Sequence, residues 1–151
     1  MTLKVAITRL PHGADLPLPS YATDGAAGVD LYAAVPTDAP IVLAPLARAL
    51  APTGIIIAVP RGYEGQVRPR SGLALRLGLT VINAPGTIDS DYRGEVMAAM
   101  INLGDAPATI TRAMRIAQLV IAPVSRIAWV ETDNIEDTAR GASGFGSTGM
   151  L

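Results

Sequence analysis

Residues 83–95 are the part of this sequence whose side chains are best suited to chemistry. They read Asn-Ala-Pro-Gly-Thr-Ile-Asp-Ser-Asp-Tyr-Arg-Gly-Glu and lie between two strand-like runs, so we predict a hairpin with polar residues at its tip. In such a pocket the Asn83 amide can read the edge of an amide-like base, Tyr92 can lie against a sugar, and Asp89 can orient a water molecule. The alternative is a polar turn whose Asp side chains satisfy turn amides, but that turn requires neither two acids nor a tyrosine.

A second candidate lies at residues 69–74, Pro-Arg-Ser-Gly-Leu-Ala, where a strand-like run gives way to a short helix predicted over 71–77. Ser71 is the expected N-cap of this helix, and Gly78 is expected to end it. Arg70, the Ser71 hydroxyl and the amides at the helix start would form an anion site, because unpaired N–H groups and the helix dipole favour phosphate. An ordinary helix cap is the alternative that this segment alone leaves open.

Asp30 lies inside the apolar run Ala-Ala-Gly-Val-Asp-Leu-Tyr-Ala-Ala of residues 26–34. An unpaired carboxylate is costly to bury, so Asp30 is expected to be hydrogen-bonded, paired or near an ion. The sequence has no cysteine and a single histidine, His12, which excludes thiolate metal sites, cysteine nucleophiles and sites with several histidines. Any chemistry must therefore come from carboxylates, hydroxyls, arginines, backbone amides or a bound ion.

The elements that must position these residues are predicted to be strands. The 151 residues suit one domain, half of them are hydrophobic, and 15 Gly and 12 Pro disfavour long helices. Short runs rich in β-branched residues recur about every ten residues, as in a sandwich, barrel or jelly roll. These predicted strands are residues 3–8, 54–59, 64–68, 79–82, 95–102, 116–122 and 127–131.

Charge and hydropathy exclude several partners. The net charge of -1 gives no overall basic field for nucleic acid. Arg9 and Pro11 interrupt the first apolar run, and the uncharged runs are shorter than a membrane span, so we expect a soluble, cytoplasmic chain without membrane contact. Residues 132–151 are acidic and then rich in Gly and Ser, and they predict a mobile arm that carries Phe145.

Five segments, in this order, resemble the five motifs of the homotrimeric deoxyuridine triphosphate nucleotidohydrolases, the dUTPases. They are residues 26–34, 69–74, 83–95, 115–119 and 140–149. The resemblance implies an all-β, jelly-roll-like β-clip subunit with one short helix and a flexible C-terminal arm. Residues 1–131 would form the catalytic core, and residues 132–151 the arm that closes over a neighbouring subunit's active site. It also implies a homotrimer whose sites are shared between subunits.

The activity that this resemblance implies is the hydrolysis of dUTP to dUMP and pyrophosphate with Mg²⁺, which keeps uracil out of DNA and supplies dUMP for dTMP synthesis. Asp89 matches the carboxylate that orients and helps to deprotonate the water that attacks the α-phosphorus. Asp30 matches an acid that reaches the metal through water, while the triphosphate holds most of the ion. The residues that match phosphate contacts are Arg70, Ser71, Gly72 and Gln118.

Selectivity is expected from residues 83–97. Fixed groups around uracil would be left unpaired against cytosine, and Tyr92 packed on the sugar would exclude a 2′-hydroxyl. From the arm, Arg140 would reach the γ-phosphate and Phe145 would stack on uracil. The residues that match the nucleoside pocket are Asn83, Gly86, Thr87, Ile88, Asp89, Tyr92 and Met97. Those that would wrap the phosphates from the arm are Gly146, Ser147 and Thr148.

Two other readings stay open at the level of sequence. The related dCTP deaminases share the fold, but they carry a second Ser after the Arg-Ser pair, where this chain has Gly72. A non-catalytic, nucleotide-binding or regulatory trimer would have no need of the carboxylate at Asp89, which is present here. Both features favour hydrolysis.

Overall fold

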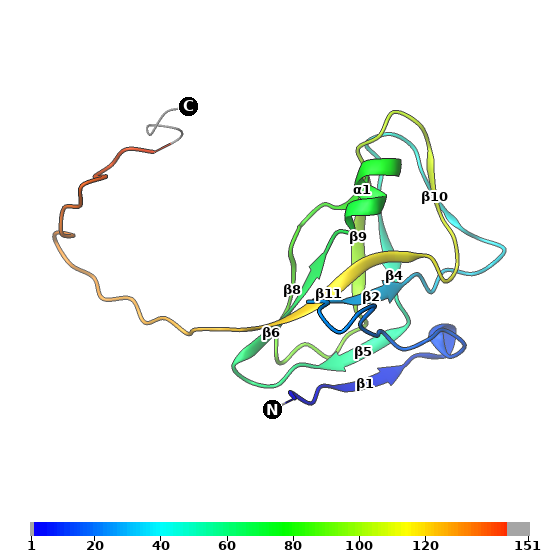
Figure 1. Ribbon diagram of the computed structural model, residues 1–151, viewed down its shortest axis with the longest axis horizontal. Coiled ribbons are helices and arrows are strands. Elements are labelled where there is room, and N and C mark those ends of the chain that lie inside the picture. The colour runs from blue at the N-terminus through cyan, green and yellow to red at the C-terminus, as the bar shows by residue number, and fades with distance from the viewer. Residues whose placement is uncertain (1, 145–151) are drawn as a thin grey trace.

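Short antiparallel strands make up most of the fold (Figure 1). The computed structural model describes residues 2–144. Within them the strands are β1 (Ala6–Arg9), β2 (Val29–Tyr32), β3 (Ile41–Leu43), β4 (Arg48–Pro52), β5 (Ile55–Ala58), β6 (Tyr63–Arg68), β7 (Leu79–Val81), β8 (Gly86–Ile88), β9 (Met97–Asn102), β10 (Ala108–Ile110) and β11 (Arg115–Pro123). The predicted all-β, jelly-roll-like subunit is thereby confirmed.

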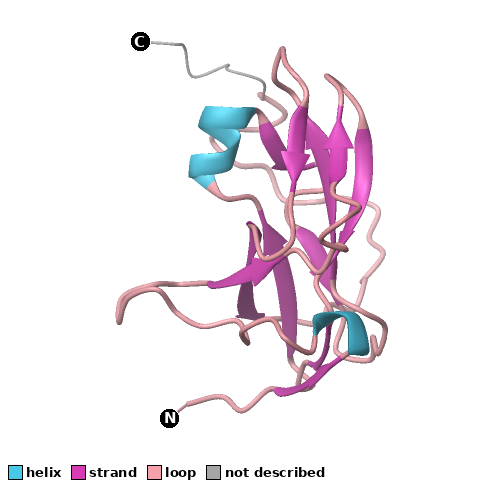
Figure 2. Ribbon diagram, turned by 90° about the vertical axis from the view of Figure 1, so that its right-hand side faces the viewer, coloured by secondary structure: helices cyan, strands magenta, loops and turns pink. Residues whose placement is uncertain are grey.

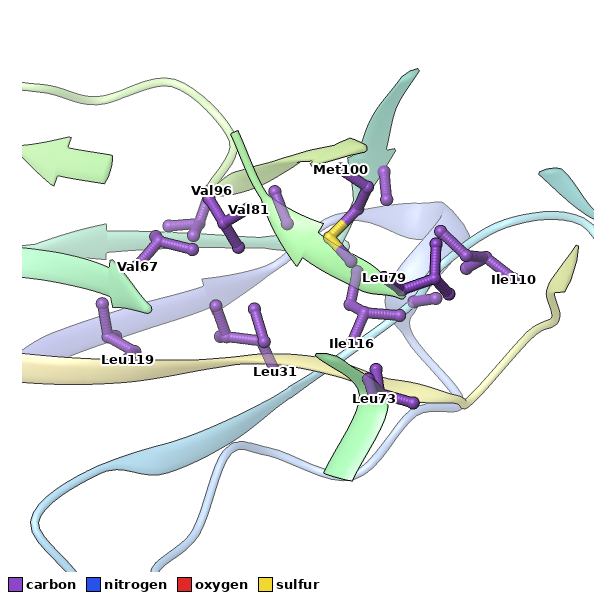
Figure 3. Close-up of a cluster of buried hydrophobic side chains, with 14 of the residues drawn as sticks. Leu31, Val67, Leu73, Leu79, Val81, Val96, Met100, Ile110, Ile116 and Leu119 are labelled. Atoms are coloured by element: carbon purple, nitrogen blue, oxygen red, sulfur yellow. The ribbon is translucent and has the colours of Figure 1, made fainter. Parts of the chain in front are cut away.

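Two larger sheets form the body of the molecule. One has the strand order β2-β11-β6-β8 and the other the order β4-β9-β7, and the pairs β1-β5 and β10-β3 complete the fold. Alternate residues of the strands point inward, as in β9 with its alternating burial. The inward side chains of both large sheets meet in one apolar core, shown in Figure 3. Each large aliphatic side chain buried there contributes about 1.5–3 kcal/mol of transfer free energy.

The helix α1 (Ser71–Leu77) has the predicted bounds but not the predicted cap. Its N-cap is Arg70, in extended conformation and without a side-chain cap hydrogen bond, so the expectation that Ser71 caps it was wrong. The helix ends at Gly78, whose φ of 65° is left-handed and whose N–H donates to the Ala74 carbonyl. A 3-10 helix, η1 (Pro11–Gly13), lies at the other end of the molecule (Figure 2).

Residues 83–95 differ from the predicted hairpin. The strand β8 pairs with β6 and not with β9, so the turn after β8 joins one large sheet to the other. The close approach at Gly65 of β6 favours this pairing, because a Cβ there would be only 3.0 Å from that of Ile88. A glycine at that position lets Ile88 pack closely onto β6.

The predicted strand at residues 127–131 was also wrong. The chain leaves the sheets after β11 and runs away from them (Figure 1), and residues 124–144 form neither helix nor strand. Trp129 is 90% exposed, and its neighbours Ile127 and Val130 are exposed as well. Within the described residues, no helix combines the length and the apolar character needed to cross a bilayer.

Candidate active site

The first group of predicted site residues surrounds a hollow of about 320 Å³, called here the Arg70 hollow. Three strands bring the group together, because β11 pairs with β2 on one side and with β6 on the other. Gln118 of β11 lies opposite both Asp30 and Arg68, and Arg70 follows directly after β6. The lining includes Asp30, Arg70, Ser71, Gly72, Arg115 and Gln118.

The carboxylate of Asp30 forms ion pairs with two arginines. Its Oδ1 lies 2.8 Å from Nε of Arg70, and its Oδ2 lies 3.1 Å from Nη1 of Arg115. The Asp30 side chain is 16% exposed, and it is both ion-paired and hydrogen-bonded, in agreement with the expectation that its charge is not buried alone. Two guanidinium groups against one carboxylate leave a net positive charge, which suits an anion.

Gln118 is held in place by the backbone around it. Its Nε2 donates to the Pro69 carbonyl at 3.0 Å, which ties β11 to the segment that precedes α1. A Cβ at Gly28 would lie 3.0 Å from Oε1 of Gln118, so the glycine leaves room for this side chain. The amide oxygen and the two arginines therefore lie around the same hollow.

The second group of predicted site residues lines another hollow, of about 310 Å³, which is called here the Tyr92 hollow. Tyr92 closes the turn after β8 by donating its N–H to the Asp89 carbonyl, and its hydroxyl donates to the Glu95 carbonyl at 3.0 Å. Asp89 is exposed and also borders a groove of about 640 Å³ on its other side. The lining of the Tyr92 hollow is Leu50, Thr87, Ile88, Asp89, Tyr92, Glu95 and Met97.

Asn83 and Gly86 lie next to each other at the start of the same segment. The Asn83 amide nitrogen is 3.1 Å from the position that a Cβ of Gly86 would take. Asn83 is exposed, whereas Gly86 is buried against β6. Neither residue is among those that line the Tyr92 hollow in the single chain.

The two hollows lie at opposite ends of one strand pair. Because β6 and β8 are antiparallel, Arg70 follows one end of the pair and Asp89 follows the other, where Ile88 faces Gly65. Five to six residues at about 3.3 Å each put roughly 20 Å between them. A single chain therefore does not bring the predicted water-orienting carboxylate to the predicted phosphate contacts.

The remaining predicted residues belong to the C-terminal segment. Arg140 donates from Nε to the Ser143 carbonyl at 3.0 Å, in the part of the chain that leaves the sheets. Phe145, Gly146, Ser147 and Thr148 lie outside the described residues.

Sequence reasoning missed two charged residues of these hollows, Arg115 and Glu95. Both stand at the edge of a segment that was singled out, since Arg115 opens residues 115–119 and Glu95 closes residues 83–95. Their positions in those segments were the available signal. Their partners depend on strand register and on contacts distant in sequence, which a single sequence does not display.

Comparison with known proteins decides the family. The dUTPase family model matches residues 14–149. The chain belongs to the dUTPase family. The deoxyuridine 5'-triphosphate nucleotidohydrolase of Methylocella silvestris is 61% identical to this dUTPase-family chain over 147 residues, which are 97% of this chain and 92% of the relative.

Solved dUTPases share the fold. The dUTPase of Staphylococcus bacteriophage 80alpha, solved with dUpNHpp, superposes with a TM-score of 0.87 at 24% identity, over 99% of this chain and 100% of that one. A dUTPase variant from phage phi11 of S. aureus, whose structure concerns the coordination of a structural Mg(II) ion, superposes with a TM-score of 0.77 at 21% identity. That match covers 89% of this chain and 100% of the phage chain.

The donor set fits a magnesium ion that the substrate itself holds. Within residues 2–144 there is no group of three or more His, Asp or Glu side chains that could chelate a metal. Both oxygens of Asp30 already face arginines, but a carboxylate has further lone pairs that can accept from a metal-bound water. Mg²⁺ commonly keeps several waters and binds substrate phosphates, so these residues are compatible with outer-sphere contact to such an ion.

Proposed function

We propose that this chain hydrolyses dUTP to dUMP and pyrophosphate, by attack of water on the α-phosphorus. The observation that carries the proposal is the pair of hollows, one lined by two arginines and one lined by a carboxylate and a tyrosine. The first suits a triphosphate, and the second suits a nucleoside beside an activated water. The name and the identity of the Methylocella silvestris relative support the same reaction.

At the Tyr92 hollow, Asp89 would orient the attacking water and accept its proton. In-line phosphoryl chemistry depends on position and charge neutralisation more than on a strong base, so an exposed carboxylate suffices. Tyr92 would pack on the sugar, and Met97 would line the wall beside the base. Asn83 with the backbone of residues 86–89 would read uracil, because a cytosine amino group would leave those groups unpaired.

At the Arg70 hollow, the arginines and the Gln118 amide would bind the phosphate oxygens. The Ser71 hydroxyl and the Gly72 amide would add donors at the start of α1. Mg²⁺ held by the triphosphate would neutralise part of its charge, and Asp30 would contact that ion through water.

We further propose that the active unit is a homotrimer with shared sites. The distance of roughly 20 Å between Asp89 and Arg70 along one chain supports this, because one dUTP molecule must meet both. Residues 132–151 would then reach a neighbouring subunit, with Arg140 at the γ-phosphate, Phe145 on the base, and Gly146, Ser147 and Thr148 around the phosphates. Such closure excludes water other than the nucleophile.

The cellular setting is part of the same proposal. The chain would act in the cytoplasm on a free nucleotide and would bind neither nucleic acid nor membrane. The net charge of -1 supports the absence of a nucleic-acid partner. Its product dUMP would supply dTMP synthesis, and removal of dUTP would keep uracil out of DNA.

The proposal is tested by measuring pyrophosphate release from dUTP, dCTP, dTTP and UTP, each with Mg²⁺ and with a chelator. We expect release from dUTP alone and its loss with chelator. Binding of dUTP without turnover would favour a regulatory protein instead, and a uracil nucleotide formed from dCTP would favour a deaminase.

A further inference from the structure

Glu95 joins two distant parts of the chain through one carboxylate oxygen. Its Oε1 accepts a hydrogen bond from the Gly54 N–H at 2.7 Å and lies 2.8 Å from Nε2 of His12. Because a carboxylate oxygen only accepts, His12 is the donor of the second bond. The Glu95 side chain is 19% exposed, so its bond to Gly54 is partly shielded from solvent, whereas the His12 side chain is 44% exposed and its bond to Glu95 lies in contact with water.

The two donors meet at this oxygen because two glycines touch. A Cβ on Gly13 would lie 2.7 Å from the Gly54 Cα, and Gly54 itself has a φ of +69° that side chains rarely adopt. The Leu10 N–H also donates to the Gly54 carbonyl at 2.8 Å. The 3-10 helix η1 is therefore fixed against the turn before β5, with His12 next to Glu95.

Arg112 fixes η1 from its other side. Its guanidinium donates to the His12 carbonyl at 2.8 Å and to the Val35 carbonyl at 2.9 Å, and it pairs with Asp15. The Arg112 hydrogen bond holds the pKa of the Asp15 carboxyl below its usual range. Arg112 thus holds the backbone of His12, whose imidazole is 44% exposed and bonded to Glu95.

The backbone of Glu95 is what holds Tyr92. The Tyr92 hydroxyl donates to the Glu95 carbonyl at 3.0 Å, and the ring lies over Gly94, where a Cβ would be 2.3 Å from the hydroxyl oxygen. The next residue, Val96, is fully buried and donates its N–H to the Ile55 carbonyl. Tyr92 itself is 43% exposed, so its place depends on these few contacts.

We propose that Glu95 is a positioning residue for sugar selectivity. By binding Gly54 and His12 it fixes the backbone to which Tyr92 is bonded, and thereby fixes the wall that faces the 2′-carbon of the substrate. Glu95 lines the Tyr92 hollow but acts through Tyr92. This inference rests on the proposed dUTP hydrolysis and adds a residue that sets how strongly UTP is rejected.

The test compares kcat/KM for dUTP with kcat/KM for UTP in purified full-length variants. In Glu95→Ala we expect the ratio of kcat/KM for dUTP to kcat/KM for UTP to fall about ten-fold, because the backbone to which Tyr92 is bonded loses its anchor. Glu95→Gln is the matched control, since its amide oxygen still accepts from Gly54, and its ratio should stay within about three-fold of the wild type. His12→Ala removes one of the two contacts of Glu95, so its dUTP-to-UTP ratio should lie between those of Glu95→Gln and Glu95→Ala.

A double variant tests whether Glu95 acts through Tyr92. If it does, adding Glu95→Ala to Tyr92→Phe lowers the dUTP-to-UTP ratio no further than Tyr92→Phe alone, because both changes remove the same constraint. A folded Glu95→Ala variant with an unchanged ratio, or additive losses in the double variant, would overturn the inference. Should Glu95→Ala not fold, an unchanged ratio in the exposed His12→Ala variant would overturn it. Failure of the proposed function looks different, since the wild type would then release no pyrophosphate from dUTP.

Discussion

Asp89 is the residue on which the proposed reaction depends, and Asp91 lies two residues further along the same exposed turn. We expect Asp89→Asn to lower kcat for dUTP by about 10³-fold, because an amide cannot accept the proton of the attacking water. Binding of dUTP, measured by calorimetry, should change only a few-fold. The matched control Asp91→Asn removes the same charge and should keep turnover. Full turnover in Asp89→Asn would show that another group takes the proton.

Asp30 gives a second prediction at this scale. Its carboxylate faces both Arg70 and Arg115, and an amide in its place would present an N–H to one of the two guanidinium groups. We therefore expect Asp30→Asn to raise KM for dUTP about ten-fold or more, through misplaced arginines and a lost contact to metal-bound water. Steady-state kinetics at several Mg²⁺ concentrations check this. Asp24→Asn, in the exposed loop before β2, is the control that should leave KM unchanged.

At the residue scale, composition predicts which groups take part but not which groups meet. The cost of a buried charge predicted that Asp30 is hydrogen-bonded, paired or near an ion, and the structure shows it paired with two arginines. Its partners depend on the register of β11 between β2 and β6, and only the fold sets that register. The roles of Asp89 and of the other matched residues stay predictions.

Among the elements, α1 depends on the glycine at which it ends. A Cβ at Gly78 would lie 2.2 Å from the Gly104 nitrogen, and φ there is +65°. We expect Gly78→Ala to lower the free energy of unfolding by more than about 2 kcal/mol. Gly62 also has a positive φ, of 85°, but nothing lies within 4 Å of its Cβ position, so Gly62→Ala should cost only about 1 kcal/mol. Urea unfolding at equal protein concentration separates the two, and equal losses would contradict the steric argument.

At the element scale, the sequence predicts strands well where they are long and apolar and poorly elsewhere. The bounds of α1 and the strand at β6 follow from local pattern. Of the four three-residue strands in the described part of the chain, β7 was predicted as residues 79–82, whereas β3, β8 and β10 carry too few residues for a period to show. Residues 127–131 have the apolar pattern of a strand, but no strand within residues 2–144 pairs with them. The sequence pattern therefore predicts an extended backbone, and the presence of a partner strand decides whether that segment joins a sheet.

For the whole molecule, residues 124–144 form the longest described stretch outside the sheets (Figure 1). We expect removal of residues 141–151 to lower kcat/KM for dUTP by about 10²-fold or more, because closure over the substrate is lost. The thermal unfolding midpoint and the oligomer mass should not change, since the core lies within residues 16–119. Light scattering and calorimetry supply these controls. Unchanged activity would show that the segment has no part in the reaction.

The placement of Asp89 and Arg70 at opposite ends of the β6–β8 pair has a genetic consequence. Where each site draws on two subunits, Asp89→Asn and Arg70→Ala are complementary alleles. Random mixing of the two subunits leaves about a quarter of the sites with both groups intact. A site built within one chain would leave none. A cell that depends on this gene would then grow with both defective copies and fail with either one alone.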